Sequence, residues 1–167
     1  LQAHLDYTSG KKKAFSPAPG GSMHESGRAF DIDLSRIKVS LREFWDLAKV
    51  HGVVPIIAEP NPREKECWHF ECRGSHQLVY DYYAAGKASN FRPAQAMAVS
   101  AIVSVGVPND NVRALGIAWI QSALIRLGGT PGALDGAVGP KTMRSFQEIC
   151  DRDDIVIPPS GVVDDVV

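Results

Sequence analysis

The sequence predicts an α+β protein, with a small antiparallel sheet in its first half and helices in its second half. Alternating apolar and polar residues over 29–34 are typical of a half-buried strand. Two strand-like runs, 53–57 and 68–72, flank a polar loop and indicate a β-hairpin. Beyond residue 112, apolar residues recur at helical spacing, so we expect a separate helical unit there.

The first strand is predicted over 29–34, soon after Gly27, which permits a turn. The alternation along the strand directs Asp31 toward a polar site. The apolar members of the strand point the other way and are expected in the core: Phe30, Ile32 and Leu34.

A helix is predicted over 41–50, between a start signal and a stop signal. Ser40 and Glu43 match the capping-box pattern, in which each side chain accepts the other residue's backbone N–H, and Gly52 ends the helix. The run 53–57 follows, and its apolar residues indicate a buried strand.

Glu66 lies just before the second strand of the hairpin, which begins near Trp68. Successive side chains of a strand alternate between two faces, so His69 and Glu71 share a face. Glu66 and His69 are an odd number of positions apart and would face opposite ways in a regular strand. We therefore place Glu66 in the loop, where its carboxylate could reach a metal-activated water without binding the metal.

Helices account for most of the remaining chain. Ser75 is expected to cap a helix that ends at Gly86. An Ala- and Val-rich helix over 93–106 is expected to pack between the two halves of the chain. Two further helices follow; the first ends at Gly128, and the second begins at Pro140, where proline suits the first helical position.

His24, Asp31 and His69 supply the ligand types of a catalytic zinc site. Zinc binds His nitrogen and Asp oxygen, and catalytic sites use three protein ligands and keep a fourth position for water. Glu66 is then left for proton transfer.

Two more carboxylates share a strand face with these ligands: Asp33 with Asp31, and Glu71 with His69. Each could orient a ligand histidine, as metal sites commonly require, or lie on the solvated surface. The remaining histidines are expected to be structural or solvated: His4, His51 and His76.

The amino-acid composition argues against nucleic-acid binding and against a membrane-spanning segment. The 167 residues carry 18 basic and 19 acidic side chains, a formal net charge of -1, so there is no basic footprint for nucleic acid. No apolar run approaches the roughly 20 residues that span a bilayer.

Three cysteines cannot all pair within the chain. Cys67 is expected to be a small buried residue, and Cys72 could bridge to Cys150.

Two motifs in the first half, Ser-x-His-x-x-Gly-x-Ala-x-Asp and then Glu-x-x-His, resemble those of the zinc D-alanyl-D-alanine peptidases. That family includes D,D-carboxypeptidases, D,D-dipeptidases and phage endolysin peptidases, and it shares its fold with the hedgehog signalling domain. The matching residues are Ser22, His24, Gly27, Ala29, Asp31, Glu66, Trp68 and His69.

This resemblance implies a small antiparallel-sheet catalytic domain over 1–86. It also implies that zinc (Zn2+) is the cofactor, with His24, Asp31 and His69 as its ligands. Glu66 would act first as general base and then as general acid, and Ser22 would contact the substrate.

One expected residue has no counterpart. The family usually has an arginine upstream of the first motif, where it stabilises the developing oxyanion, but residues 1–21 contain none. Either that arginine lies outside this sequence, or a run of lysines, Lys11 to Lys13, supplies point charges instead. The chain starts at Leu1 with neither Met nor a signal peptide.

The second half resembles the three-helix peptidoglycan-binding domain, which we expect over 112–167, after a linker and packing helix at 87–111. The motif is Ile-Gln-x-x-Leu-x-x-x-Gly, then Asp-Gly-x-x-Gly-x-x-Thr, then Phe-Gln. Most of its residues are expected to be structural, so we assign no sugar contact: Ile120, Gln121, Leu124, Gly128, Asp135, Gly136, Gly139, Thr142, Phe146 and Gln147.

Together the resemblances imply a zinc metallopeptidase, a hydrolase of amide bonds in peptidoglycan stem peptides, with D-alanyl-D-alanine carboxypeptidase activity as the first expectation. The alternatives are an endolysin-type endopeptidase and a non-catalytic wall-binding protein with a vestigial zinc site. The expected partners are peptidoglycan and muropeptides. We expect a monomer located outside the cell or in the cell wall, or in the periplasm of a Gram-negative source.

Overall fold

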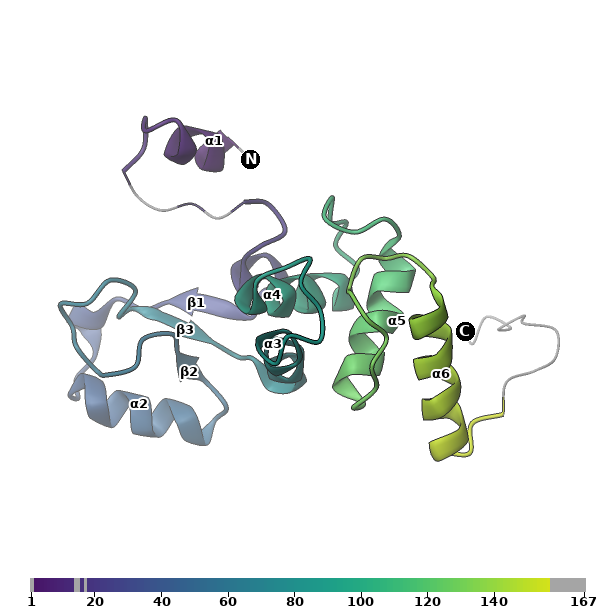
Figure 1. Ribbon diagram of the computed structural model, residues 1–167. Helices are drawn as coiled ribbons and strands as arrows, with labels where there is room; N and C mark the ends of the chain where they lie inside the picture. Colours follow the sequence, from purple (N-terminus) through teal and green to yellow (C-terminus); the bar gives the residue numbers. More distant parts are fainter. Residues whose placement is uncertain (1, 14–15, 17, 157–167) are drawn as a thin grey trace.

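The computed structural model describes residues 2–13, 16 and 18–156. Within these residues it has six α-helices and one three-stranded antiparallel sheet, which confirms the predicted α+β class (Figure 1). The tail 157–167, which belongs to the predicted wall-binding unit, lies outside the described residues.

The sheet is small, and its central strand is the last of the three in the chain. Its order is β1-β3-β2, where the strands are β1 (Ala29–Asp31), β2 (Val54–Pro55) and β3 (His69–Glu71). β2 and β3 pair antiparallel, as predicted for the hairpin. In the pairing of β1 with β3, Asp31 lies directly opposite His69.

β1 is shorter than the predicted strand over 29–34, and the prediction that Phe30 lies in the core is wrong. Asp33 caps a 3-10 turn at Leu34–Arg36, which ends the alternation. The edge position of β1 then leaves Phe30 39% exposed, although its ring stacks on Phe70 at 6.4 Å between centroids. Phe70 is fully buried instead.

Helix α2 (Leu41–Val50) covers the face of the sheet that carries Phe70. The Phe44 ring meets the Phe70 ring edge-on at 5.1 Å between centroids. The predicted capping box is present, since Ser40 accepts from the Glu43 backbone and Glu43 accepts from the Ser40 backbone.

The remaining helices are α1 (Gln2–Thr8), α3 (Gln77–Ala84), α4 (Pro93–Ser104), α5 (Leu115–Arg126) and α6 (Pro140–Arg152). Helix α4 is the predicted packing helix and is buried around its whole circumference over Ala96 to Val103. Figure 1 shows it between the sheet and α5. A helix that is apolar all round is one that has neighbours on all sides.

One core joins the two halves of the chain. α3, α4, α5 and the loop before α6 all contribute to it, through Val79, Tyr82, Tyr83, Ala96, Val99, Val103, Ala118, Ile125 and Leu134. Two helices, α5 and α6, lie in the described part of the predicted three-helix unit. The boundaries 1–86, 87–111 and 112–167 stay a prediction.

The start of α3 and the state of the cysteines were also predicted from the sequence. Ser75 does not cap α3, because a 3-10 turn at Gly74–His76 runs directly into that helix and the Ser75 hydroxyl accepts a hydrogen bond from Arg126. Cys67 is buried as predicted, and it is free, as are Cys72 and Cys150.

Candidate metal centre

His24 lies in a 3-10 turn, Met23–Ser26, that is fixed at both ends. Ser22 caps the turn through a hydrogen bond from the His24 backbone, and Glu25 completes a capping box. Gly27 ends the turn at φ +69, a left-handed conformation that glycine adopts without strain. Met23 is buried against α4, which anchors the turn to the core.

Three side chains converge at the edge of the sheet. The distance from His24 Nε2 to His69 Nδ1 is 3.2 Å, and that from His69 Nδ1 to Asp31 Oδ1 is also 3.2 Å. The distance from His24 Nε2 to Asp31 Oδ1 is 3.5 Å. The 3-10 turn supplies one of these atoms, and the opposed strands β1 and β3 supply the other two.

These separations fit a zinc ion. Ligand atoms placed tetrahedrally around zinc at 2.0–2.2 Å lie about 3.3–3.6 Å from one another, close to the separations of 3.2–3.5 Å seen here. When both imidazoles are neutral, with their protons on the outer nitrogens, all three atoms present lone pairs to one point, and a cation there relieves their mutual repulsion. His24, Asp31 and His69 therefore form a group that could hold a metal, as predicted.

The group is open to solvent on one side. The side chains of His24 and Asp31 are 40% and 54% exposed, whereas that of His69 is 11% exposed. Burial lowers the pKa of His69, but the hydrogen bond with Glu71 and the charges of Glu71 and Asp31 outweigh burial, so the pKa of His69 lies above its ordinary value. A proton therefore competes with a metal for this imidazole.

Glu66 lies in the loop before β3, as predicted. Its backbone has φ +65, and Glu66 and Asp154 are the two non-glycine residues with positive φ in the described part of the chain. This conformation is costly for a side-chain-bearing residue and is held by a hydrogen bond from the His69 backbone to the Glu66 carbonyl, 2.9 Å. Strain of this kind is common at functional sites.

The Glu66 side chain is half-buried, and among the described residues its carboxylate makes no hydrogen bond or ion pair. A carboxylate without a permanent partner is suited to exchanging protons with a substrate or water. The role of general base stays a prediction.

The other candidates have identifiable roles. Ser22 holds the His24 turn, and a substrate contact by Ser22 stays a prediction. Asp33 accepts from Ser35 and pairs with Arg36, and it makes no contact with either ligand histidine. Glu71, by contrast, places Oε1 3.3 Å from His69 Nε2.

Arg73, which no sequence motif singled out, donates from Nε to Glu71 Oε2 at 2.6 Å. The signal was its position two residues beyond Glu71, which continues the strand alternation. Among the described residues, Lys11, Lys12 and Lys13 make no hydrogen bond or ion pair with the three candidate ligands.

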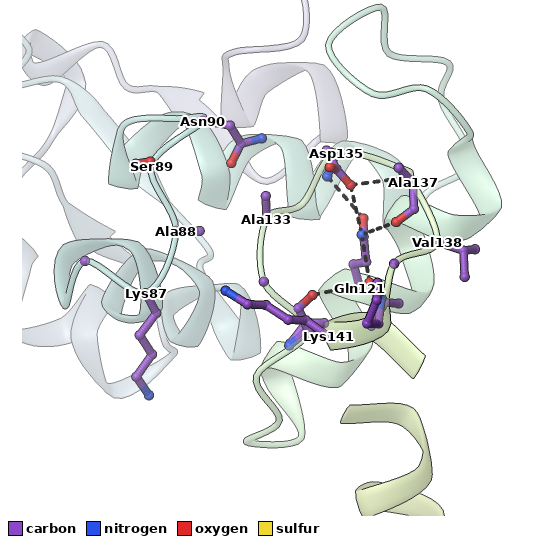
Figure 2. Close-up of a pocket in the computed structure, with 16 residues that line it drawn as sticks. Lys87, Ala88, Ser89, Asn90, Gln121, Ala133, Asp135, Ala137, Val138 and Lys141 are labelled. Carbon is purple, nitrogen blue, oxygen red and sulfur yellow. Dashed lines mark hydrogen bonds between the residues drawn. The ribbon is translucent and has the colours of Figure 1, made fainter. Parts of the chain in front are cut away.

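A second region of interest is an open groove of about 690 Å³ between the 86–90 segment, the 131–139 loop and the start of α6 (Figure 2). Gln121 is buried beneath it. The Gln121 amide donates to Asp135 Oδ1, the Ala137 carbonyl and Thr142 Oγ1 at 3.0–3.3 Å. Its oxygen accepts from the backbones of Asp135 and Gly136 at 3.1 and 2.9 Å.

The motif residues of this region therefore satisfy one another's hydrogen-bonding groups. Gly136 has φ +72, and a Cβ there would lie 2.6 Å from the backbone nitrogen of Ala114, so only glycine fits. Asn90 ties two walls of the groove by accepting from Tyr83 and donating to the Leu134 carbonyl. The prediction that most motif residues are structural agrees with these contacts.

Two lysine side chains, Lys141 and Lys87, line the groove. Lys141 extends from the start of α6 toward the 86–90 segment (Figure 2) and has no hydrogen-bond or ion-pair partner among the described residues. Lys87 lies over the Tyr82 ring, 5.4 Å from its centroid. The Asp135 carboxylate is occupied by Gln121 and by the Ala137 backbone.

Comparisons with protein-family models, with curated proteins and with solved structures gave no match to this chain. None of the helices in the described residues combines the length and the apolar character needed to cross a membrane.

Proposed function

We propose that this chain is a zinc-dependent peptidase that hydrolyses amide bonds in peptidoglycan stem peptides, with D-alanyl-D-alanine carboxypeptidase activity as the first candidate. The observation that supports the metal centre is the convergence of His24 Nε2, Asp31 Oδ1 and His69 Nδ1 at 3.2–3.5 Å. The resemblance of the two motifs to the D,D-peptidases supports the substrate class.

Each residue has a task in this proposal. His24, Asp31 and His69 hold the zinc, which when bound supplies a Lewis acid and acidifies water. Glu66 accepts a proton from the attacking water and returns it to the leaving amine nitrogen. The Ser22 hydroxyl, beside the His24 turn, contacts the peptide.

The test is mass spectrometry of purified muropeptides before and after incubation with the full chain. Loss of one alanine from pentapeptide-bearing muropeptides identifies the carboxypeptidase reaction. The matched control is the Glu66→Gln variant, which keeps the size of the side chain. Unchanged muropeptide masses with the zinc-loaded wild-type chain would refute the proposal and favour a vestigial site.

The exposure of His24 and Asp31 favours a second candidate reaction, endopeptidase cleavage of cross-linked stems. A ligand group that is 40% and 54% exposed leaves room for a bulky, cross-linked peptide. Conversion of cross-linked dimers to monomers in the same mass spectra distinguishes this reaction from the removal of terminal alanine.

We also propose that the groove between the 86–90 segment and α6 holds peptidoglycan. Its free lysines suit the carboxylates of stem peptides, and tethering raises the local substrate concentration. Because the core is shared by α3, α4 and α5, the full chain is used in a pelleting assay with insoluble peptidoglycan. Lys141→Ala should pellet several-fold less than the wild type. Lys65→Ala is the control, because Lys65 is exposed and does not line the groove; equal pelleting of both variants contradicts the assignment.

A further inference from the structure

A line of polar side chains runs from the candidate metal ligand His69 to helix α3. His69 Nε2 lies 3.3 Å from Glu71 Oε1, and Arg73 Nε donates to Glu71 Oε2 at 2.6 Å. Arg73 Nη1 then donates to Gln77 Oε1 at 3.0 Å, and Gln77 Nε2 donates to Asp81 Oδ1 at 2.9 Å. The line begins at β3 and ends on a helix that packs into the shared core.

The direction of the hydrogen bonds is fixed by Arg73. A guanidinium has donors only, and an ionised carboxylate has acceptors only. With Oε2 of Glu71 bonded to Arg73, the other oxygen faces His69 Nε2 as an acceptor, so Nε2 carries the hydrogen. His69 Nδ1 is then left with a lone pair, which points at His24 and Asp31, 3.2 Å away in each case.

The burial of the surrounding side chains favours one tautomer of His69 over the other. The side chains of His69 and Glu71 are 11% and 9% exposed, and that of Arg73 is 23% exposed, so little water can substitute for a missing partner. The opposite tautomer would direct the lone pair of Nε2 at the Glu71 oxygen and the hydrogen of Nδ1 at the metal position. A hydrogen on Nδ1 would have an acceptor in Asp31 Oδ1, 3.2 Å away, but the Asp31 side chain is 54% exposed and can bond water instead. The Glu71 side chain is 9% exposed, so its oxygen has no such substitute for the Nε2 donor, and the Nε2–H tautomer is favoured.

We propose that Arg73 is a positioning residue for the metal centre: through Glu71 it holds His69 as the Nε2–H tautomer and so keeps Nδ1 open to zinc. This inference rests on the proposed zinc site for its consequence, but the tautomer itself is a property of the metal-free chain.

The first test reads the tautomer directly. Long-range ¹H–¹⁵N NMR of the uniformly labelled, metal-free full chain, at an alkaline pH where imidazoles are neutral, should show His69 with the hydrogen on Nε2. In Glu71→Gln, Arg73 claims the amide oxygen and the amide NH₂ is left facing Nε2. His69 should therefore invert to the Nδ1–H tautomer in that variant.

The second test measures zinc affinity by competition with a chelator. Changing partners that orient a ligand histidine typically weakens metal binding about 10- to 100-fold. Glu71→Gln should show a loss in this range, Arg73→Gln a loss near its lower end, and Arg73→Lys a partial rescue. Circular dichroism of each variant checks that the fold is kept.

Arg36 provides the matched control. It forms an arginine–carboxylate pair with Asp33, 3.1 Å long and well exposed, which touches no candidate ligand. Arg36→Gln should leave both the His69 tautomer and the zinc affinity unchanged.

The outcomes separate this inference from the proposed function. A wild-type His69 in the Nδ1–H form, or an unchanged tautomer and zinc affinity in both Glu71→Gln and Arg73→Gln, overturns the inference. The NMR arm is decisive even if a variant is too unstable, because the wild-type tautomer alone can contradict it. A chain that binds zinc with the predicted tautomer but leaves muropeptides intact refutes only the peptidase proposal.

Discussion

The two motif-bearing regions of this molecule differ in what their polar residues do for one another. Around Gln121 the motif residues satisfy each other's hydrogen bonds, and a glycine fits where no side chain can. Around His69 three motif side chains bring His24 Nε2, Asp31 Oδ1 and His69 Nδ1 within 3.2–3.5 Å of one another, and two of these side chains are exposed. The first pattern stabilises a fold, whereas the second brings together atoms that could bind a metal.

A motif alone does not reveal which of these two patterns its residues form. Both motifs are equally visible in the sequence, but only the contacts in the structure distinguish residues that build a turn from residues whose atoms converge as metal ligands could. The same criterion separates the groove lysine Lys141, which has no polar partner in the described residues, from Asp135, whose Oδ1 accepts from Gln121 and from the Ala137 backbone.

The largest expected effect is the loss of zinc when one of the three candidate ligands is removed. Wild-type chain should bind about one zinc, and His69→Ala should lose it, because a catalytic site depends on each of three protein ligands. Metal analysis of dialysed protein measures this. Full zinc content in His69→Ala would show that the convergence is not the metal centre.

Gln121→Ala should have the opposite profile, with zinc binding kept and stability lost. The change leaves several buried donors and acceptors unpaired at once, and each such group costs about 1–3 kcal/mol. We expect the free energy of unfolding to fall by roughly 3–4 kcal/mol, measured by denaturant unfolding. A loss of zinc affinity in the folded variant would mean that the two regions are not separate in function.

His76, a buried histidine outside both regions, makes the stability of the fold depend on pH. His76 bonds Ser100 at 2.8 Å, and Ser100 in turn bonds Ser122 at 2.6 Å. Burial, together with the nearby charges of Arg126 and Arg28, lowers the pKa of His76 from 6.5 to about 4. The folded state therefore favours neutral His76, and its contribution is present above pH 6.5 and is lost as pH falls toward 4.

The loss across that window should be roughly 2–3 kcal/mol of unfolding free energy. Carboxylates titrate at similar pH, so the measurement is the difference between the wild type and His76→Gln in denaturant unfolding from pH 7 to 4. Parallel curves for the two proteins would show that His76 does not titrate on unfolding.

Much of the fold near the site could be predicted from local patterns. The capping box at Ser40, the turn at Gly27 and the hairpin all follow from residue types at fixed spacing, and all are present. The placement of Glu66 outside the strand followed from parity and is correct. Local chemistry decides features of this kind, so a sequence reveals them.

Features that depend on distant partners were not predictable. Phe30 is exposed because β1 lies at the sheet edge, and strand alternation cannot distinguish an edge strand from a central one. The direct opposition of Asp31 and His69 is a matter of register between strands 38 positions apart. Arg73 was missed because its importance comes from the partner that it holds, Glu71.

One paired measurement tests the proposed division of roles, in which three residues bind the metal and Glu66 moves the proton. Zinc content and muropeptide turnover are measured on the same preparation of Glu66→Gln. We expect unchanged zinc content and a kcat lower by about 10²- to 10⁴-fold, since the amide keeps the shape of the side chain but cannot accept the proton. Zinc lost together with activity would make Glu66 a ligand, and full activity with zinc bound would assign the proton transfer to another group; either result contradicts this division of roles.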